Sequence, residues 1–222
     1  TNTDDTGTSP PLLDQIIMKQ NVSRGSTLSE EDWHVAFKEQ FDPQKVIQKA
    51  LDMYKCEENK LEAAQGVYQS TLLRWTAYID RESLLINPEG NHQRKAKLAI
   101  LRDSMSTLYI SMANLSKTNN DHWGVVDAYQ TGTSCLISKS SGNLWLEYAR
   151  FCLGVKKARA KQVFLRALVG SHANVRDGEV PDNDPHYKQL WNDFLALERG
   201  LTGNTGLTLE GLCRHLGMDS IP

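Results

Sequence analysis

The residues of this chain that could do chemistry are its histidines and cysteines, and their spacing predicts no catalytic or metal site. The six histidines fall singly along the sequence, at His34, His92, His122, His172, His186 and His215. The four cysteines also stand alone, at Cys56, Cys135, Cys152 and Cys213. They form no C-x-x-C pair, so we expect free thiols in a reducing compartment, used as small core residues. The sequence therefore predicts no metal ion and no cofactor.

Motifs for nucleophilic catalysis and phosphate binding are missing from the sequence as well. It contains no G-x-S-x-G, no H-E-x-x-H and no Gly-rich loop followed by Lys and Ser or Thr. The segment Gly203-Asn-Thr-Gly206 lacks the preceding strand and the lysine of a phosphate cradle. His34 and Glu31 are helix neighbours of a kind that is common on protein surfaces. We therefore expect that the protein is not an enzyme.

Two basic segments could contact the phosphates of RNA. One contains Arg94, Lys95 and Lys97, and the other contains Lys156, Lys157 and Lys161. However, the net charge of the chain is −2, and its aromatic residues do not alternate with basic ones as a base-stacking surface would require. Solvated helix faces explain such clusters more often, so RNA contact is an alternative and not the main expectation.

The elements that must position these residues are expected to be helices throughout. Apolar residues recur every three or four positions, and no segment alternates apolar and polar residues as a strand does. Two long helices are expected in the middle, from Leu61 to Glu82 and from about Asn91 to Leu115, joined at a turn over 87–90 and packed antiparallel. No run approaches the 18 or more apolar residues of a membrane helix, so we expect no membrane contact.

The chain is expected to form one helical-repeat domain over residues 11–222, after a polar, disordered linker over residues 1–10. Because the sequence opens without Met, we expect it to be part of a longer protein. Shorter helices are predicted over 12–17 and after the capping residues Ser29, Asp42, Asp121 and Asp184. Residues 170–185 are rich in Gly, Asn, Asp and Pro and predict a long acidic surface loop, which could bind a partner. A short helix within 207–216 is expected to cover the end of the domain.

The clearest repeat unit covers residues 143–169 and consists of two short amphipathic helices with a predicted break at Gly154. Neither helix is long enough to be stable alone, so each must pack against a neighbour. The pattern Trp-x-x-aromatic of its first helix returns twice elsewhere. The residues expected to pack the repeats are Trp75, Tyr78, Trp145, Tyr148, Gly154, Ala158, Phe164, Ala167, Trp191 and Phe194.

These residues resemble the HAT (half-a-TPR) repeat. Its first helix carries Trp-x-x-Tyr/Phe-x-x-x-Glu, and its second carries Ala-Arg-x-apolar-aromatic-x-Arg-Ala-Leu after a Gly turn. The resemblance is good over 144–168 and covers half a motif over 75–82 and 191–200. Position 152 departs from the pattern, because it is Cys where the family usually has Glu.

The resemblance implies an all-α fold, built as an α-solenoid of antiparallel, TPR-like helical hairpins with two longer helices in the middle. It also implies a nuclear, non-catalytic scaffold that binds other protein subunits of an RNA-processing assembly, such as one that processes mRNA, and it admits a homodimer. An alternative is the TPR-like domain of a Bub/Mad-type spindle-checkpoint protein, which the stretch 73–80 resembles. That family lacks the pattern found over 154–168.

Overall fold

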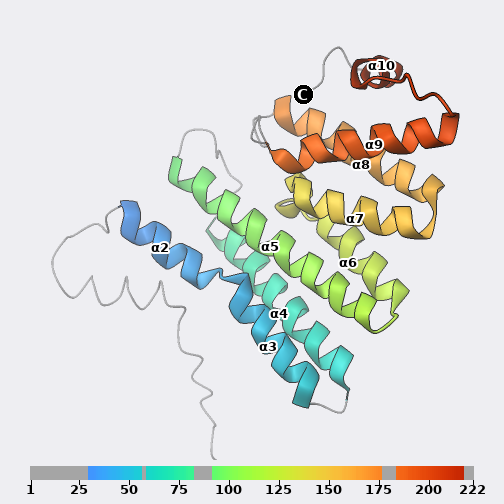
Figure 1. Ribbon diagram of the computed structural model, residues 1–222. Helices are drawn as coiled ribbons and strands as arrows, with labels where there is room; N and C mark the ends of the chain where they lie inside the picture. The colour runs from blue at the N-terminus through green and yellow to red at the C-terminus, as the bar shows by residue number, and fades with distance from the viewer. Residues whose placement is uncertain (1–29, 57–58, 83–91, 177–183, 218–222) are drawn as a thin grey trace, which may run out of the picture.

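The computed structural model describes residues 30–56, 59–82, 92–176 and 184–217, and every regular element in these ranges is helical. The all-α prediction is therefore confirmed (Figure 1). The helices are α2 (Glu30–Gln40), α3 (Pro43–Cys56), α4 (Lys60–Arg81), α5 (His92–Thr118), α6 (His122–Ser134), the short 3₁₀ helix η2 (Ser138–Ser140), α7 (Gly142–Val155), α8 (Lys157–Arg176), α9 (Pro185–Thr202) and α10 (Leu209–His215).

Aspartates begin several of these helices, as the sequence predicts. The side chain of Asp121 accepts a hydrogen bond from the backbone N–H of Gly124 at 2.9 Å, and Asp184 accepts one from His186 N–H at 2.9 Å. Asp42 accepts from Gln44 N–H at 2.9 Å, ahead of α3. Each bond satisfies a backbone donor that has no partner inside the helix. The predicted cap at Ser29 and the predicted helix over 12–17 lie outside the described residues, as do the linker over 1–10 and the turn over 87–90.

The helices pack mainly against their neighbours in sequence. The most extensive contacts join α3 to α4, α5 to α6 and α7 to α8, and α9 packs against both α7 and α8. The longest helix, α5, contacts α2, α3, α4, α6 and α7, and its antiparallel packing against α4 confirms the predicted central pair (Figure 1). The short α10 packs against α9.

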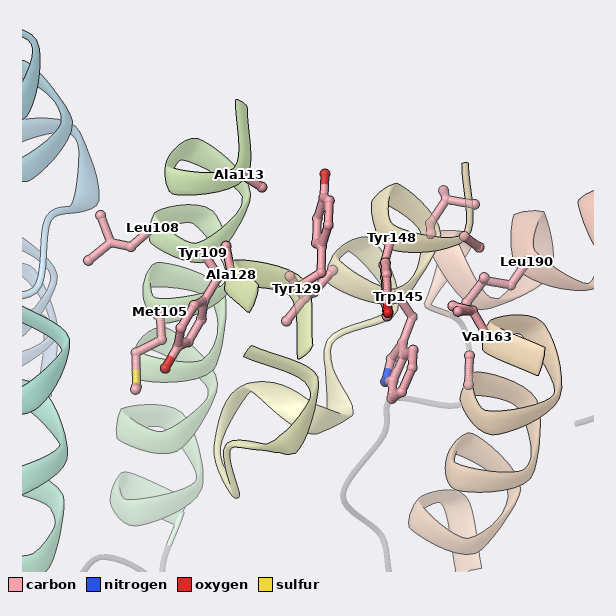
Figure 2. Close-up of a cluster of buried hydrophobic side chains, with 14 of the residues drawn as sticks. Met105, Leu108, Tyr109, Ala113, Ala128, Tyr129, Trp145, Tyr148, Val163 and Leu190 are labelled. Carbon is pink, nitrogen blue, oxygen red and sulfur yellow. The ribbon is translucent and has the colours of Figure 1, made fainter. Parts of the chain in front are cut away.

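A continuous apolar core joins these helices, and aromatic pairs mark its path. Tyr129 of α6 stacks on Tyr148 of α7, with ring centroids 5.2 Å apart. Phe164 of α8 stacks on Phe194 of α9 at 5.5 Å. Figure 2 shows Tyr129 placed between α5 and α7, so that each layer of side chains touches the next. Aromatic pairs of this kind stabilise the folded state by more than the burial of their apolar area alone would.

Two predicted boundaries are wrong. The break expected at Gly154 lies two residues later, at Lys156, because α7 continues through Val155. The loop expected over 170–185 is wrong for residues 170–176, because α8 continues through Arg176; residues 177–183 lie outside the described residues. A single glycine such as Gly170 destabilises a helix by about 1 kcal/mol, and the helix can continue past it because good helix formers such as Ala173 and Arg176 follow. The first proline after it in the sequence is Pro181.

Candidate functional site

A groove of about 610 Å³ lies between α4 and α6, with α5 beneath it. Its lining residues come from the second half of α4, from the middle of α5, and from α6 and the turn after it: Thr76, Ile79, Asp80, Tyr109, Asp127, Gln130, Thr131, Ser134, Cys135, Leu136 and Ile137. None of these lining residues was predicted as a site residue.

The groove exists because α4 and α6 both run antiparallel to α5 and lie on either side of it (Figure 1). The three helices meet at Ser116 of α5. Its hydroxyl accepts a hydrogen bond from Gln65 Nε2 of α4 at 2.9 Å, and a Cβ added to Gly124 of α6 would lie 2.7 Å from the same oxygen. The groove lies beyond this contact, toward the C-terminal ends of α4 and α6.

The floor of the groove is apolar and uncharged. Tyr109 is buried, and burial raises the pKa of its phenol well above the usual range, with a smaller contribution from the Cys135 thiol. Ile79 and Ile137 are also buried. A Cβ added to Gly132 would lie 2.8 Å from Tyr109 Cγ, so the lack of a side chain at Gly132 lets α6 lie directly on this ring.

The walls of the groove are acidic. Asp80 on α4 and Asp127 on α6 are both exposed, and neither carboxylate makes a hydrogen bond or ion pair with another described residue. No described lining residue carries a positive charge. The groove therefore presents a carboxylate on each wall above an apolar floor.

Exposed apolar side chains lie on the lining of the groove and on the turns of α4 and α6 that precede it. Trp123 is 86% exposed and lies on the same helical stripe of α6 as Asp127 and Ser134, while Leu73 is 71% exposed and lies in line with Asp80 on α4. Leu136 is 64% exposed and lies at the other end. Of these three, Leu136 lines the groove itself, and exposed apolar surface beside a concave site is typical of interaction surfaces.

Trp123 is not among the site residues that the sequence predicts. A signal was available, because the buried face of α6 follows Val125, Ala128 and Tyr129, and Trp123 lies off that face.

Most of the predicted repeat-packing residues are buried, one is half-buried and two are exposed. The buried ones are Trp75, Trp145, Tyr148, Phe164, Ala167, Trp191 and Phe194, and Tyr78 is half-buried against Phe41. Gly154 and Ala158 are exposed, so their predicted packing role is wrong. Both lie at the α7–α8 corner, before the buried face of α8 begins at Ala160.

The basic residues predicted to contact RNA do not form one surface. Lys97 places its ammonium group 5.5 Å from the ring centre of Phe37, and Lys161 pairs with Glu198 Oε1 at 2.8 Å. Arg94 is half-buried, while Lys95, Lys156 and Lys157 are exposed. The start of α5 and the α7–α8 corner lie on opposite sides of the molecule in Figure 1, so the structure does not bring the two segments together.

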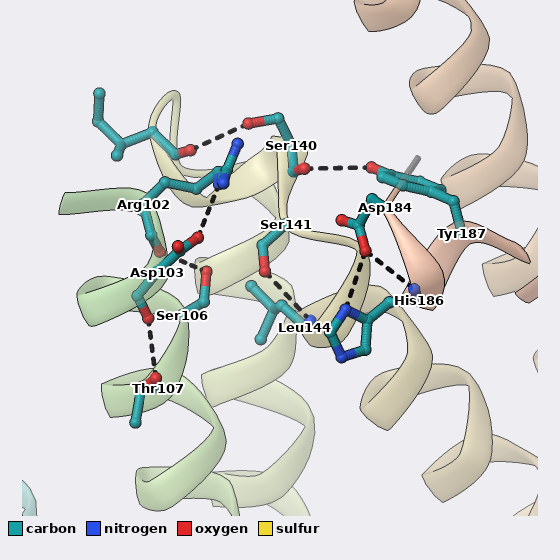
Figure 3. Close-up of polar contacts among 11 residues, drawn as sticks. Arg102, Asp103, Ser106, Thr107, Ser140, Ser141, Leu144, Asp184, His186 and Tyr187 are labelled. Carbon is teal, nitrogen blue, oxygen red and sulfur yellow. Dashed lines mark hydrogen bonds and ion pairs between the residues drawn. The ribbon is translucent and has the colours of Figure 1, made fainter. Parts of the chain in front are cut away.

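A polar cluster at the starts of α7 and α9 contains serine, histidine and aspartate (Figure 3). Asp184 Oδ1 lies 2.9 Å from His186 Nδ1, and the hydroxyl of Ser141 accepts from Leu144 N–H at 3.4 Å. Both oxygens thus cap helices, and no hydrogen bond joins Ser141 to His186 in the described structure. A Cβ added to Gly142 would lie 2.9 Å from Asp184 Oδ2, so this glycine lets the two helix starts approach. The hydroxyl of Tyr187 on α9 donates to the Ser140 carbonyl ahead of α7 at 3.3 Å, so the cluster joins the two helix starts.

No protein family, curated protein or solved structure matches this chain significantly, so the HAT resemblance depends on its motif residues alone. Within the described ranges, no helix has both the length and the apolar composition needed to cross a bilayer. In the same ranges, no group of three or more His, Cys, Asp or Glu side chains is placed to hold a metal ion.

Proposed function

We propose that the protein is a non-catalytic scaffold, an α-solenoid of HAT-like hairpins, that binds another protein in the groove between α4 and α6. The observation that carries the proposal is the groove itself, together with the exposed Leu73 and Trp123, which precede its lining residues on the same faces of α4 and α6. Its partners would be subunits of a nuclear RNA-processing assembly, as the resemblance over 144–168 implies.

Energetics support Trp123 as the main anchor for a partner. A tryptophan side chain buries roughly 150–250 Å² in an interface, which at about 25 cal/mol per Å² is a gross gain of about 4–6 kcal/mol. Tryptophan is also among the residues that most often dominate binding energy. In contrast, Trp75, Trp145 and Trp191 are already buried and can give a partner little further contact.

Affinity purification of the tagged protein from its own cells tests the proposal. We expect subunits of one RNA-processing complex to be recovered, and we expect the double variant Leu73→Glu/Trp123→Glu to lose them. A matched control, Val35→Glu/Leu201→Glu, changes two other exposed apolar residues on α2 and α9 and should retain them. Recovery of the same subunits by the groove variant would refute the groove as the binding site.

Microscopy of the same tagged protein tests the setting. We expect a nuclear signal that coincides with the recovered complex. A signal confined to kinetochores would support the Bub/Mad-type alternative instead.

A further inference from the structure

We propose that the occupant of the groove is a helix of about three turns from the partner protein, with bulky apolar residues on one face and Lys or Arg along both edges of that face. This inference rests on the proposed function, since it names the chemistry of the partner at the same site.

The charges on the walls favour a basic segment. Asp80 and Asp127 stand on opposite walls without a described partner, and no described lining residue is basic. An acidic segment would bring like charges together, which costs binding energy. A segment with Lys or Arg on each edge would pair with both carboxylates.

The floor and the ends of the groove favour apolar anchors. Tyr109, Ile79 and Ile137 supply an uncharged floor, and Leu136 is exposed on the lining. Trp123 is exposed one turn of α6 before Asp127. These groups can bury aliphatic or aromatic side chains of the partner.

The form of the walls favours a helical occupant. An extended strand that binds by backbone pairing needs an open sheet edge, whereas both walls here are helices whose backbone groups are already bonded. A helix satisfies its own backbone and can lie along α4 and α6. From Asp127 to Ser134 the α6 wall is about 10 Å long at 1.5 Å per residue, and Trp123 lies one turn before it, so a helix of about three turns reaches from Trp123 to the far end of the wall.

Selection from a displayed library of random 16-residue peptides on the full chain tests this inference without a known partner. We expect recovered peptides to carry apolar residues at i, i+3 or i+4 and i+7, with flanking Lys or Arg. Binding of each synthetic peptide to the wild-type chain and to its variants is then measured by the fluorescence anisotropy of a dye attached to the peptide. In the wild-type chain the tryptophan emission should also shift to the blue, because Trp123 is exposed while Trp33, Trp75, Trp145 and Trp191 are buried. Far-UV circular dichroism should show a gain of helix in the complex.

Two variants separate the occupant's chemistry from the proposed function. Asp80→Asn/Asp127→Asn should weaken binding about 10-fold, as expected for two partly desolvated ion pairs, and salt should weaken the wild-type complex in the same direction. The control Asp52→Asn/Glu210→Gln removes two exposed carboxylates elsewhere and should leave the affinity unchanged.

The outcomes are distinct. Peptides that lose binding to Leu73→Glu/Trp123→Glu but not to Asp80→Asn/Asp127→Asn would overturn the basic occupant and leave the groove as the binding site. Peptides that bind in an extended form would overturn the helical occupant. Selection of peptides that ignore both pairs of substitutions would overturn the inference and the groove together.

Discussion

The closeness of α6 to α5 can be tested by a pair of Gly→Ala substitutions with the same chemistry and different expected effects on stability. Gly132 is buried in α6, where an added Cβ would lie 2.8 Å from Tyr109 Cγ and 3.0 Å from Leu144 Cδ2. Gly66 is exposed in the second turn of α4, where an added Cβ would meet no atom within 4 Å.

The magnitudes follow from two effects. Replacing a helical glycine by alanine stabilises the helix by about 1 kcal/mol at either position. At Gly132 the new methyl group must also displace a buried aromatic ring, and overpacking of this kind costs about 1–3 kcal/mol. We therefore expect Gly66→Ala to stabilise the protein by up to about 1 kcal/mol and Gly132→Ala to be about 1–3 kcal/mol less stable than Gly66→Ala. The helix propensity cancels in this difference, which leaves the steric effect alone.

Urea unfolding followed by far-UV circular dichroism measures both free energies. An unchanged dependence on urea concentration would show that the variants unfold from the same compact state. The two variants having equal stability would refute the close packing of α6 on Tyr109, and with it the floor of the groove. The loss at Gly132 should also weaken peptide binding, since Tyr109 lines the site, whereas Gly66→Ala should not.

Three further predictions concern the core. Trp145→Ala should destabilise the protein by about 3–5 kcal/mol in urea unfolding, because the ring is buried. Trp145→Phe should cost less, although it loses the bond of 2.7 Å from Nε1 to the Lys139 carbonyl; equal losses would contradict the packing role. Iodoacetamide at pH 8 should modify the exposed Cys56 first, whereas Cys152, whose pKa is raised by burial, should react only on unfolding, as mass spectrometry would show. Stability should fall as pH rises above 10, because the unfolded state then releases tyrosine protons that the folded state keeps. The slope is about 1.4 kcal/mol per pH unit for each group, and a flat profile would contradict the burial of these tyrosines. Burial raises the pKa of Tyr68, Tyr109, Tyr129 and Tyr187.

Local patterns in the sequence predicted the helices and many of their starts. The three- and four-residue spacing of apolar side chains was enough for α4 and α5, because an amphipathic helix carries its buried face in its own sequence. The caps at Asp121 and Asp184 were equally local, since each aspartate bonds within its own first turn. Gly154 misled for the same reason, because a glycine marks a helix end only when the following backbone leaves the helix, and here Lys156 does so.

The groove was decided by tertiary structure alone. Asp80 and Asp127 are 47 positions apart in the sequence and carry no shared motif; they line one site because α5 lies between two helices that run the same way. The exposure of Trp123 also depends on which neighbours cover α6, and the periodicity of a single helix describes only its own buried face. Likewise, the sequence shows that Lys97 and Lys161 are basic but not what they contact. In the fold, Lys97 lies over aromatic rings of α2, and Lys161 pairs with a carboxylate of α9. The sequence by itself therefore determined which segments are helical and which faces are buried. Which side chains meet at a surface depends on distances between segments, and these only the packed fold decides.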